Sequence, residues 1–215
     1  MDGNNRWSKK NNFTSYHSYK KGANNLIKLT NFIFDHTNTK YVSAFALSKN
    51  NLKRSQKLIS MLRGLLLEFV DNFLQDDNKI NYNIVFIGDR SFLDAKINKK
   101  INKLENLSKK SKKYLIIFLN YSGQEDIVQA AHNYHLNLKK NYTKKNFKDF
   151  LLTKDFPDPD ILIRTGGHSR LSDFIIYQST FTELFFIKKL WPDLSKNDLL
   201  KIFNKFYLLE RKFGL

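Results

Sequence analysis

Residues 158–167 read DPDILIRTGG. Within them, Asp160–Arg164 is a short apolar run bounded by prolines and glycines, which is typical of a strand covered on both faces of a parallel sheet. A threonine and two glycines follow its terminal arginine. Ligands in open α/β sheets bind beyond the carboxyl ends of the strands, so we expect functional residues at Arg164 and just after it.

Similar apolar runs recur along the chain, separated by longer segments with apolar residues at helical spacing. The predicted strands are Tyr41–Leu47, Tyr82–Gly88, Lys113–Leu119, Asp160–Arg164 and Glu183–Ile187. The predicted helices are Gly22–Asp35, Ser55–Gln75, Phe92–Ser108, Gln124–Lys139 and Ser195–Lys212. This alternation predicts one α/β domain over residues 1–215, with a mainly parallel central sheet of about five to six strands flanked by helices.

Two helices carry additional local signals. In Ser55–Gln75 a wide apolar stripe indicates one buried face. Its members are Leu58, Leu62, Leu65, Leu66, Phe69 and Phe73. Ser195 and Asp198 have the spacing of a capping box, which predicts that the last helix begins after Ser195.

Composition narrows the class of protein. The chain has 215 residues, 41% of them hydrophobic, which suits one domain with a full-sized core. It has no cysteine, so disulfide scaffolds and Cys-ligated zinc are excluded and a cytoplasmic setting is the default expectation. No uninterrupted apolar run is long enough to predict a membrane span, and the first residues do not resemble a signal peptide.

The net charge of +17 favours anionic partners such as nucleic acid, acidic lipid or phosphorylated metabolites. The charge comes mostly from lysine, because the sequence holds only seven arginines. Lysine and asparagine can both rise through coding bias, which is an equally good explanation. Reading of base edges relies most on arginine, so a nucleic-acid partner is not expected.

The first candidate site is the segment Met1–Trp7, which reads MDGNNRW. It combines a carboxylate, a glycine, two amide side chains and an arginine. Backbone N–H groups of such a turn can hold phosphate, and arginine adds charge-assisted hydrogen bonds. The alternative is an ordinary polar turn near the chain end.

The second candidate site follows the strand Asp160–Arg164 and extends to Ser172. Arg164 and Arg170 flank a Gly-Gly turn with hydroxyl side chains beside them. Two guanidinium groups can each form paired hydrogen bonds to a diphosphate, and glycines let the backbone approach its oxygens. The alternative is a loop whose arginines pair with acidic residues on the surface.

The third candidate is Glu183, a carboxylate within the apolar segment FTELFF. Burying such a group is costly unless it is paired or bound to a metal. Asp2 and Glu183 could together hold Mg²⁺, which takes few carboxylates and completes its shell with water and phosphate oxygens. The alternative is a salt bridge from Glu183 to a nearby arginine.

Taken together, these motifs resemble the cis-prenyltransferase family, which includes undecaprenyl diphosphate synthase and other isoprenyl transferases. The resembling segments are MDGNNRW (1–7), SKNNLKRS (48–55), NYSGQEDI (120–127), DPDILIRTGG (158–167), the stretch 170–183, LWPD (190–193) and ERKFG (210–214). They occur in the family's order and cover essentially the whole chain.

The resemblance implies a Mg²⁺-dependent transferase that condenses isopentenyl diphosphate with an allylic diphosphate. Asp2, Ser48 and Asn51 would be catalytic, with Ser48 and Asn51 beside the proton lost after condensation, and Asp2 and Glu183 would bind Mg²⁺. Substrate binding is implied for Gly3, Asn4, Asn5, Arg6, Trp7, Tyr19, Leu52, Arg54, Arg164, Arg170 and Ser172.

The resemblance also implies surroundings for the site. An apolar tunnel would take the lengthening chain, and Leu62, Leu66 and Phe69 are candidates to line it, with plain core packing as the alternative. A homodimer is expected, with heteromeric pairing left open. The apolar product and the lysine-rich surface favour peripheral contact with an anionic membrane.

The sequence departs from the family pattern at several positions. An arginine and a histidine that serve the allylic diphosphate in the family are Ser15 and Tyr19 here, with His17 nearby. In the segment SKNNLKRS, Leu52 replaces an aromatic residue of the family pattern. In the first motif, Asn5 replaces a glycine. The glutamate and histidine that follow the Gly-Gly turn in the family become His168 and Ser169.

The family also has a complete strand before its MDGN motif. A missing central strand would leave unpaired backbone groups and an open apolar slot, so we expect that strand to belong upstream of Met1.

Two alternatives to an active enzyme remain at this point. The changes at Ser15 and Tyr19 and the absent strand are compatible with a catalytically impaired subunit that supports an active partner. The net charge alone would fit a nucleic-acid binder, whose affinity would depend strongly on salt.

Overall fold

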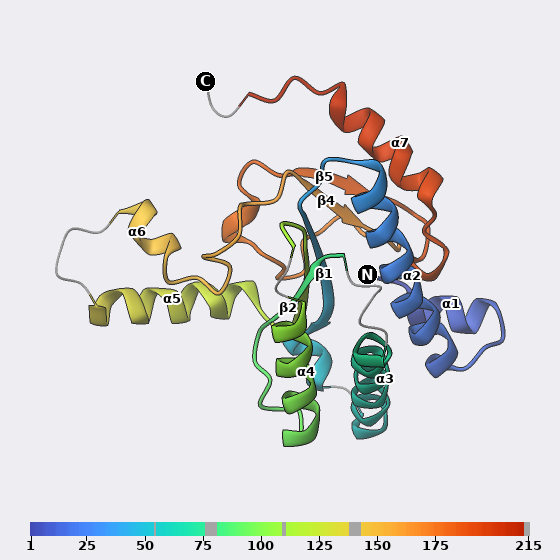
Figure 1. Cartoon of the computed structure of the whole chain (residues 1–215). Helices are drawn as coiled ribbons and strands as arrows, with labels where there is room; N and C mark the ends of the chain where they lie inside the picture. Colours follow the sequence, from blue (N-terminus) through green and yellow to red (C-terminus); the bar gives the residue numbers. More distant parts are fainter. Residues whose placement is uncertain (54, 76–80, 109–110, 138–142, 213–215) are drawn as a thin grey trace.

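The computed structural model describes residues 1–53, 55–75, 81–108, 111–137 and 143–212 (Figure 1). Five strands form two parallel sheets within them. The larger sheet has the order β1–β3–β2, and the smaller pairs β4 with β5. The strands are β1 (Tyr41–Ser48), β2 (Asn83–Ile87), β3 (Tyr114–Tyr121), β4 (Ile161–Arg164) and β5 (Glu183–Phe186). All pairings are parallel, so the predicted α/β class is confirmed, but the strands are divided between two sheets.

The helices are α1 (Asn4–Lys10), α2 (Ser15–His36), α3 (Gln56–Gln75), α4 (Ala95–Leu107), α5 (Gly123–Asn137), α6 (Lys144–Lys148) and α7 (Lys196–Tyr207). Short 3₁₀ turns occur at η1 (Lys49–Lys53), η3 (Tyr177–Ser179) and η4 (Trp191–Asp193). The capping box of α7 is confirmed, because the Ser195 side chain accepts from the amide of Asp198 and the Asp198 carboxylate accepts from the amide of Ser195. Helix α1 was not expected from the sequence.

Strand β3 divides the core into two clusters, one on each face of the larger sheet. Leu115 and Ile117 pack in the cluster that also holds side chains of α2, α4 and α7. Ile116 and Phe118 point to the opposite face and pack with Phe174. Burial on both faces explains why the strands are nearly continuous apolar runs.

The outer edge of β2 is closed by side chains of α4 and the residue after it. The amide of Ile84 donates to Ser108 Oγ at 3.0 Å, and the amide of Phe86 donates to Glu105 Oε1 at 2.8 Å. Arg90 donates to the same Glu105 oxygen at 2.6 Å and fixes it in place. These contacts satisfy groups that an edge strand would otherwise expose.

Across the described ranges, none of the helices combines the length and the apolarity that crossing a bilayer requires.

The capping box yields a stability prediction. Replacing Ser195 with alanine removes the acceptor for the Asp198 amide and should lower the free energy of unfolding by about 1 kcal/mol. Urea denaturation followed by circular dichroism measures this change. The same substitution at exposed Ser60, inside α3, should leave stability nearly unchanged, and equal losses at both positions would contradict the capping role.

Candidate active site

The backbone of Asp2 is fixed to the carboxyl end of β4. Its amide donates to Thr165 Oγ1 at 3.0 Å, and the same hydroxyl donates to the Asp2 carbonyl at 2.9 Å. The amide of Trp191 donates to that carbonyl as well, at 3.0 Å. Thr165 is buried. Together, these three hydrogen bonds fix the position of the Asp2 backbone.

The carboxylate of Asp2 lies between two guanidinium groups. Arg164 Nη2 is 3.1 Å from Oδ2, and Arg6 Nη2 is 3.3 Å from Oδ1. Partial burial alone would raise the pKa of Asp2, but the hydrogen bonds and charges of Arg164 and Arg6 outweigh it and hold the pKa below its ordinary value. Asp2 is therefore ionised at neutral pH.

Arg164 also connects this carboxylate to the loop after β4. Its Nη1 donates to Ser172 Oγ at 2.6 Å and to the carbonyl of Arg170. The side chain is only 13% exposed, whereas that of Asp2 is 36% exposed. Arg164 is thus a fixed cation at the base of the site, with the Asp2 carboxylate open to the cavity.

Gly166 allows Arg6 to approach the strand end. It has a φ of 88°, and a Cβ there would lie 2.4 Å from Arg6 Nη2. Arg6 Nη1 donates to the Gly166 carbonyl at 2.7 Å. A side chain at this position would displace the second guanidinium of the site.

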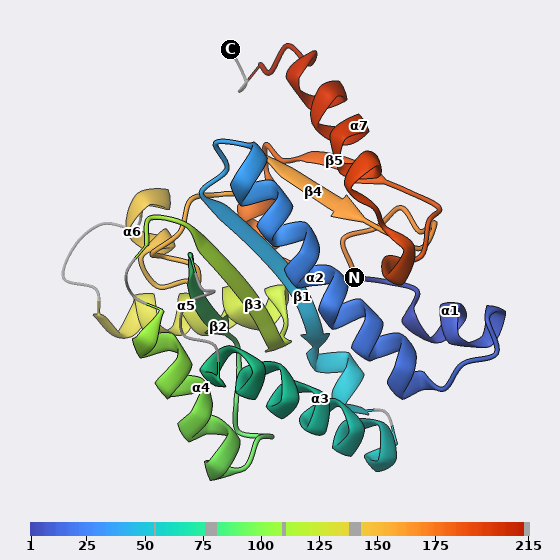
Figure 2. The same cartoon turned by 45° about the vertical axis from the view of Figure 1, so that its right-hand side comes forward.

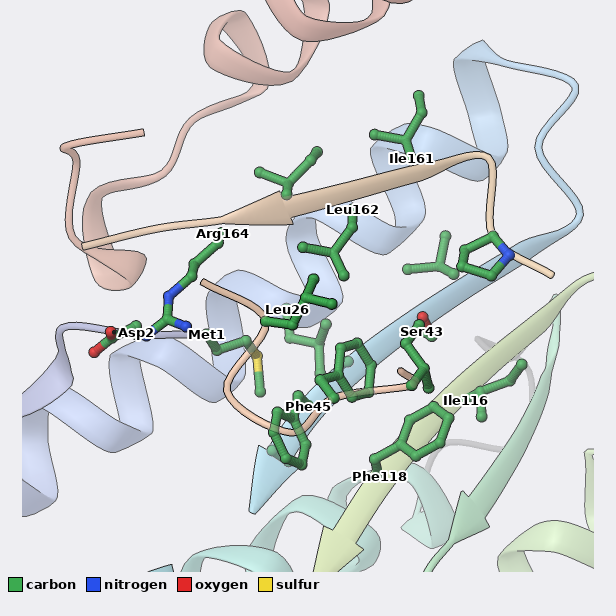
Figure 3. A pocket seen from close by; sticks show the side chains of 18 of the residues that line it. Met1, Asp2, Leu26, Ser43, Phe45, Ile116, Phe118, Ile161, Leu162 and Arg164 are labelled. Carbon is green, nitrogen blue, oxygen red and sulfur yellow. Dashed lines mark hydrogen bonds and ion pairs between the residues drawn. The ribbon is translucent and has the colours of Figure 1, made fainter. Parts of the chain in front are cut away.

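These residues line one end of a cavity of about 1320 Å³. Most of the predicted site residues share it: Asp2, Gly3, Asn4, Asn5, Arg6, Tyr19, Ser48, Asn51, Arg164, Arg170 and Ser172. Figure 3 shows Asp2 and Arg164 at this end and apolar side chains such as Phe45 and Phe118 farther along. A charged end continuous with an apolar wall suits a molecule with an anionic head and a hydrocarbon chain.

Two predicted substrate-binding residues, Trp7 and Leu52, lie elsewhere. Trp7 is buried and donates to Asp193 Oδ1 at 2.7 Å, so it anchors α1 rather than lining the cavity. Leu52 packs against the main core. Arg54 lies outside the described residues.

The predicted tunnel residues and the nearby histidine are also placed away from this cavity. Leu62, Leu66 and Phe69 of α3 pack against the main core cluster and are not among the residues that line it. The His17 ring stacks on Phe13, with 4.3 Å between their centroids. Neither His17 nor Ser15 lines the cavity, whereas Tyr19 does.

Glu183, the second predicted Mg²⁺ ligand, lies apart from Asp2. Parallel pairing places it opposite Ile161, at the amino end of β4, whereas Asp2 is bonded to Arg164 at the carboxyl end. Three residues of strand separate these ends, about 10 Å. The register thus places the two residues at opposite ends of the strand pair, and the described residues contain no group of three or more His, Cys, Asp or Glu that could hold a metal ion.

Asp2 alone is still a suitable carboxylate ligand for Mg²⁺. The ion commonly uses one or two carboxylates and takes its remaining ligands from water and substrate phosphate oxygens. The Asp2 carboxylate is ionised and open to the cavity. In the same motif, Asn4 Oδ1 and Asn5 Oδ1 are buried acceptors without a hydrogen-bond partner, and Asn4 Oδ1 lies against Gly22 of α2.

Several residues at the site were given no role from the sequence. Thr165 fixes Asp2, and Asn50, Gln124 and His168 line the cavity. Thr165 and His168 lie in or just after the DPDILIRTGG segment, so its position at a strand end could have indicated them. The hydrogen bonds of Thr165 to residue 2 depend on tertiary contact and leave no local signal.

Comparison with known proteins gives consistent results. The sequence matches the family model described as undecaprenyl diphosphate synthase over residues 1–214. A tritrans,polycis-undecaprenyl-diphosphate synthase (geranylgeranyl-diphosphate specific) of Pyrobaculum aerophilum is 35% identical over 223 residues, covering 99% of this chain and 92% of that protein. An isoprenyl transferase of Thermotoga maritima is 33% identical over 219 residues, covering 100% and 94%.

A solved structure is also similar. Lavandulyl diphosphate synthase from Lavandula x intermedia, in complex with dimethylallyl diphosphate, superposes with a TM-score of 0.92. The two are 30% identical, and the match covers 100% of this chain and 95% of that one.

The hydroxyl of Thr165 gives the prediction for this site. Replacing Thr165 with valine leaves the Asp2 amide and carbonyl without this partner, which should cost about 1–3 kcal/mol of stability. It should also weaken binding of inorganic diphosphate, measured by isothermal titration calorimetry, because Asp2 and Arg6 lose their fixed position.

The matched control is Thr182→Val, which removes the hydrogen bond from another hydroxyl to the Pro159 carbonyl; Thr182 itself does not line the cavity. This variant should lose stability but keep its diphosphate affinity. If Thr165→Val also keeps its diphosphate affinity, Thr165 does not position the site.

Proposed function

The chain belongs to the cis-prenyltransferase family of undecaprenyl diphosphate synthases and isoprenyl transferases, and on that premise we propose that it condenses isopentenyl diphosphate with an allylic diphosphate to give a Z-polyprenyl diphosphate. The observation that carries the proposal is the cluster of Asp2, Arg6 and Arg164 at one end of a long cavity with apolar walls. Diphosphate groups match the cationic end, and prenyl chains match the walls.

The reaction determines what the residues must do. The bond between C1 and oxygen of the allylic diphosphate breaks, a carbon–carbon bond forms to the terminal carbon of isopentenyl diphosphate, and a proton leaves its C2. Negative charge develops on the departing diphosphate, and fixed cations stabilise it without reorganising. Arg6 lies beside Asp2 and is assigned to this leaving group, together with the Asn4 and Asn5 amides.

Isopentenyl diphosphate is assigned to the second loop. Arg164 is held by Ser172 and the Arg170 carbonyl, and Arg170 and Ser172 both line the cavity. Two guanidinium groups and a hydroxyl can bind one diphosphate in a defined orientation. Placing both substrates in one cavity removes much of the association entropy from the chemical step.

Ser48 and Asn51 are assigned to the position beside the C2 proton. They lie at the carboxyl end of β1 and in the turn η1, and both line the same cavity as Asp2. Asp2 is the residue proposed to hold Mg²⁺ together with substrate phosphate oxygens, and the ion would neutralise charge on the departing diphosphate.

The assembly and surroundings of the enzyme are part of the proposal. We expect a homodimer, and Leu184 and Phe186 of β5 are exposed apolar residues that would suit an interface. Because the product is apolar and the chain has a net charge of +17, we also expect peripheral contact with anionic membranes.

The first test is turnover by the purified chain. With Mg²⁺, labelled isopentenyl diphosphate and a dimethylallyl, farnesyl or geranylgeranyl diphosphate primer, label should enter a butanol-extractable product, and chelation with EDTA should stop it. Asp2→Asn should lower kcat by about 10²–10³-fold, because the carboxylate charge is lost. Asp155→Asn, at an exposed position outside the cavity, is the control and should retain the full rate.

Two outcomes would contradict the proposal. One is an Asp2→Asn variant with the full rate. The other is the absence of product with every primer, which would favour the supporting role beside an active partner.

A second test concerns the guanidinium fork. Arg164→Lys keeps the charge, but one ammonium cannot reach Asp2, Ser172 and the Arg170 carbonyl together. We expect kcat/KM for isopentenyl diphosphate to fall by about 10–100-fold, matching a loss of about 1.5–3 kcal/mol. Steady-state kinetics with varied isopentenyl diphosphate measures it.

Arg211→Lys provides the control for this second test. Arg211 also makes two hydrogen bonds through its fork, to Asp160 and the Phe181 carbonyl, but it does not line the cavity. Its replacement should leave kcat/KM unchanged, and an equal loss in both variants would show that Arg164 acts through stability alone.

A further inference from the structure

The loop from Arg170 to Phe174, to which isopentenyl diphosphate is assigned, has an uncommon backbone conformation. Ser172 and Asp173 have φ angles of 54° and 66°, and Ile175 follows at 36°. Residues other than glycine adopt positive φ infrequently, and for a β-branched residue it is a strained conformation. Such a backbone persists only where the surrounding structure holds it. The loop therefore depends on support from outside itself.

The start of helix α5 provides this support. The amide of Gly123 donates to the Asp173 carbonyl at 2.8 Å, and the amide of Gln124 donates to Asp173 Oδ1, also at 2.8 Å. The first amides of a helix have no partner within the helix itself. Asp173 thus caps α5 from 49 positions away in the sequence, and the two bonds fix both its backbone and its side chain.

Close packing reinforces this contact. Gly123 is buried, and a Cβ there would lie 3.1 Å from the Asp173 carbonyl oxygen and 3.2 Å from the Ile176 nitrogen. The next residue of the loop, Phe174, is buried and stacks on Phe45 with 4.6 Å between the ring centroids. The chain after Asp173 is therefore held by α5 on one side and by the core on the other.

The Asp173 carboxylate belongs to the cavity wall although diphosphates are anionic. Asp173 lines the cavity together with Ser172 and Gln124. A carboxylate beside a diphosphate would repel it unless the charge is compensated. Here Asp173 Oδ1 accepts from the Gln124 amide, at the positive end of the α5 dipole. This placement suits a residue that supports the loop better than one that contacts the substrate.

We propose that Asp173 is a positioning residue, which holds Ser172 in place for isopentenyl diphosphate by capping α5; this inference rests on the proposed function. Ser172 Oγ accepts from Arg164 Nη1 at 2.6 Å, and the Arg170 carbonyl accepts from the same nitrogen. Without the cap, the strained backbone at Ser172 and Asp173 relaxes. Ser172 and the Arg170 carbonyl then leave the Arg164 guanidinium, and the subsite loses its defined geometry.

Three substitutions separate the acceptor from the backbone conformation. Asp173→Asn keeps an oxygen that accepts from the Gln124 amide, and asparagine tolerates positive φ. Asp173→Gly permits positive φ but has no acceptor. Asp173→Ala lacks the acceptor and opposes the backbone conformation as well.

The matched control is Asp94→Ala, which removes another helix cap. The Asp94 carboxylate accepts from the Ile97 amide of α4 at 2.8 Å, and neither residue lines the cavity. Asp94 has a φ of −71°, so alanine brings no backbone strain. This variant should lose stability without a change in affinity for isopentenyl diphosphate.

Isothermal titration calorimetry with isopentenyl diphosphate and no primer measures this affinity without turnover. Asp173→Gly and Asp173→Ala should weaken it by about tenfold, and Asp173→Asn should retain it. With a primer present, KM for isopentenyl diphosphate should rise by the same factor, while kcat and KM for the primer change by less than about threefold. A role in overall stability alone would produce neither this split nor the rescue by asparagine.

Unchanged affinity in Asp173→Gly would overturn the proposal, and so would an equal loss in Asp94→Ala or in Asp173→Asn. Because glycine accepts the backbone conformation, Asp173→Gly decides the outcome even where the alanine variant does not fold.

The calorimetry also separates this inference from the proposed function. A chain that binds isopentenyl diphosphate through Asp173 but yields no product would sink the enzyme assignment and leave the positioning role standing. Turnover that does not depend on Asp173 would do the reverse. A chain without affinity for isopentenyl diphosphate would overturn both.

Discussion

One ion pair holds together the parts of the chain on which the site depends. Arg164 Nη2 and Asp2 Oδ2 are 3.1 Å apart, and 162 positions separate the two residues in the sequence. Arg164 is largely buried, and a buried guanidinium without a partner would be strongly destabilising. The contact therefore ties the first motif to the end of β4 and draws the loop of Arg170 and Ser172 to the same point.

The same contact explains why the site has a charged end and an apolar remainder. Fixed guanidinium groups gather where β4 ends, while the rest of the cavity is bounded by side chains from the two core clusters. Arg6 and Arg164 act as forks to defined acceptors, as Arg90 does with Glu105 and the Phe86 carbonyl. The arginines at the site are therefore better evidence of function than the overall excess of lysine.

Much of the fold could be predicted from the sequence because its strands are buried on both faces. Continuous apolar runs between turn residues located all five strands to within about two residues. Helix α4 begins at Ala95, later than predicted, because Asp94 accepts a hydrogen bond from the Ile97 amide and caps it. Helix α1 was missed because NNRWSKK has no apolar periodicity.

Part of the site was also predictable, because the strands were expected to be parallel. Motifs at strand ends converge in a parallel sheet, so most of the candidates share one cavity. Glu183 was predicted to share a Mg²⁺ ion with Asp2, but sequence motifs do not specify strand register. Pairing with Ile161 places Glu183 at the opposite end of the strand pair. The division into two sheets likewise depends on which edges find partners, which composition does not reveal.

The closed outer edge of β2 has a consequence for how this protein behaves in solution. With Ser108 and Glu105 occupying the amides of Ile84 and Phe86, that rim offers no template on which identical molecules could stack into fibrils. The opposite rim of the three-stranded sheet, on β1, faces β4 (Figure 2). At the β2 rim, side chains of the same molecule therefore take the place that an incoming strand would need.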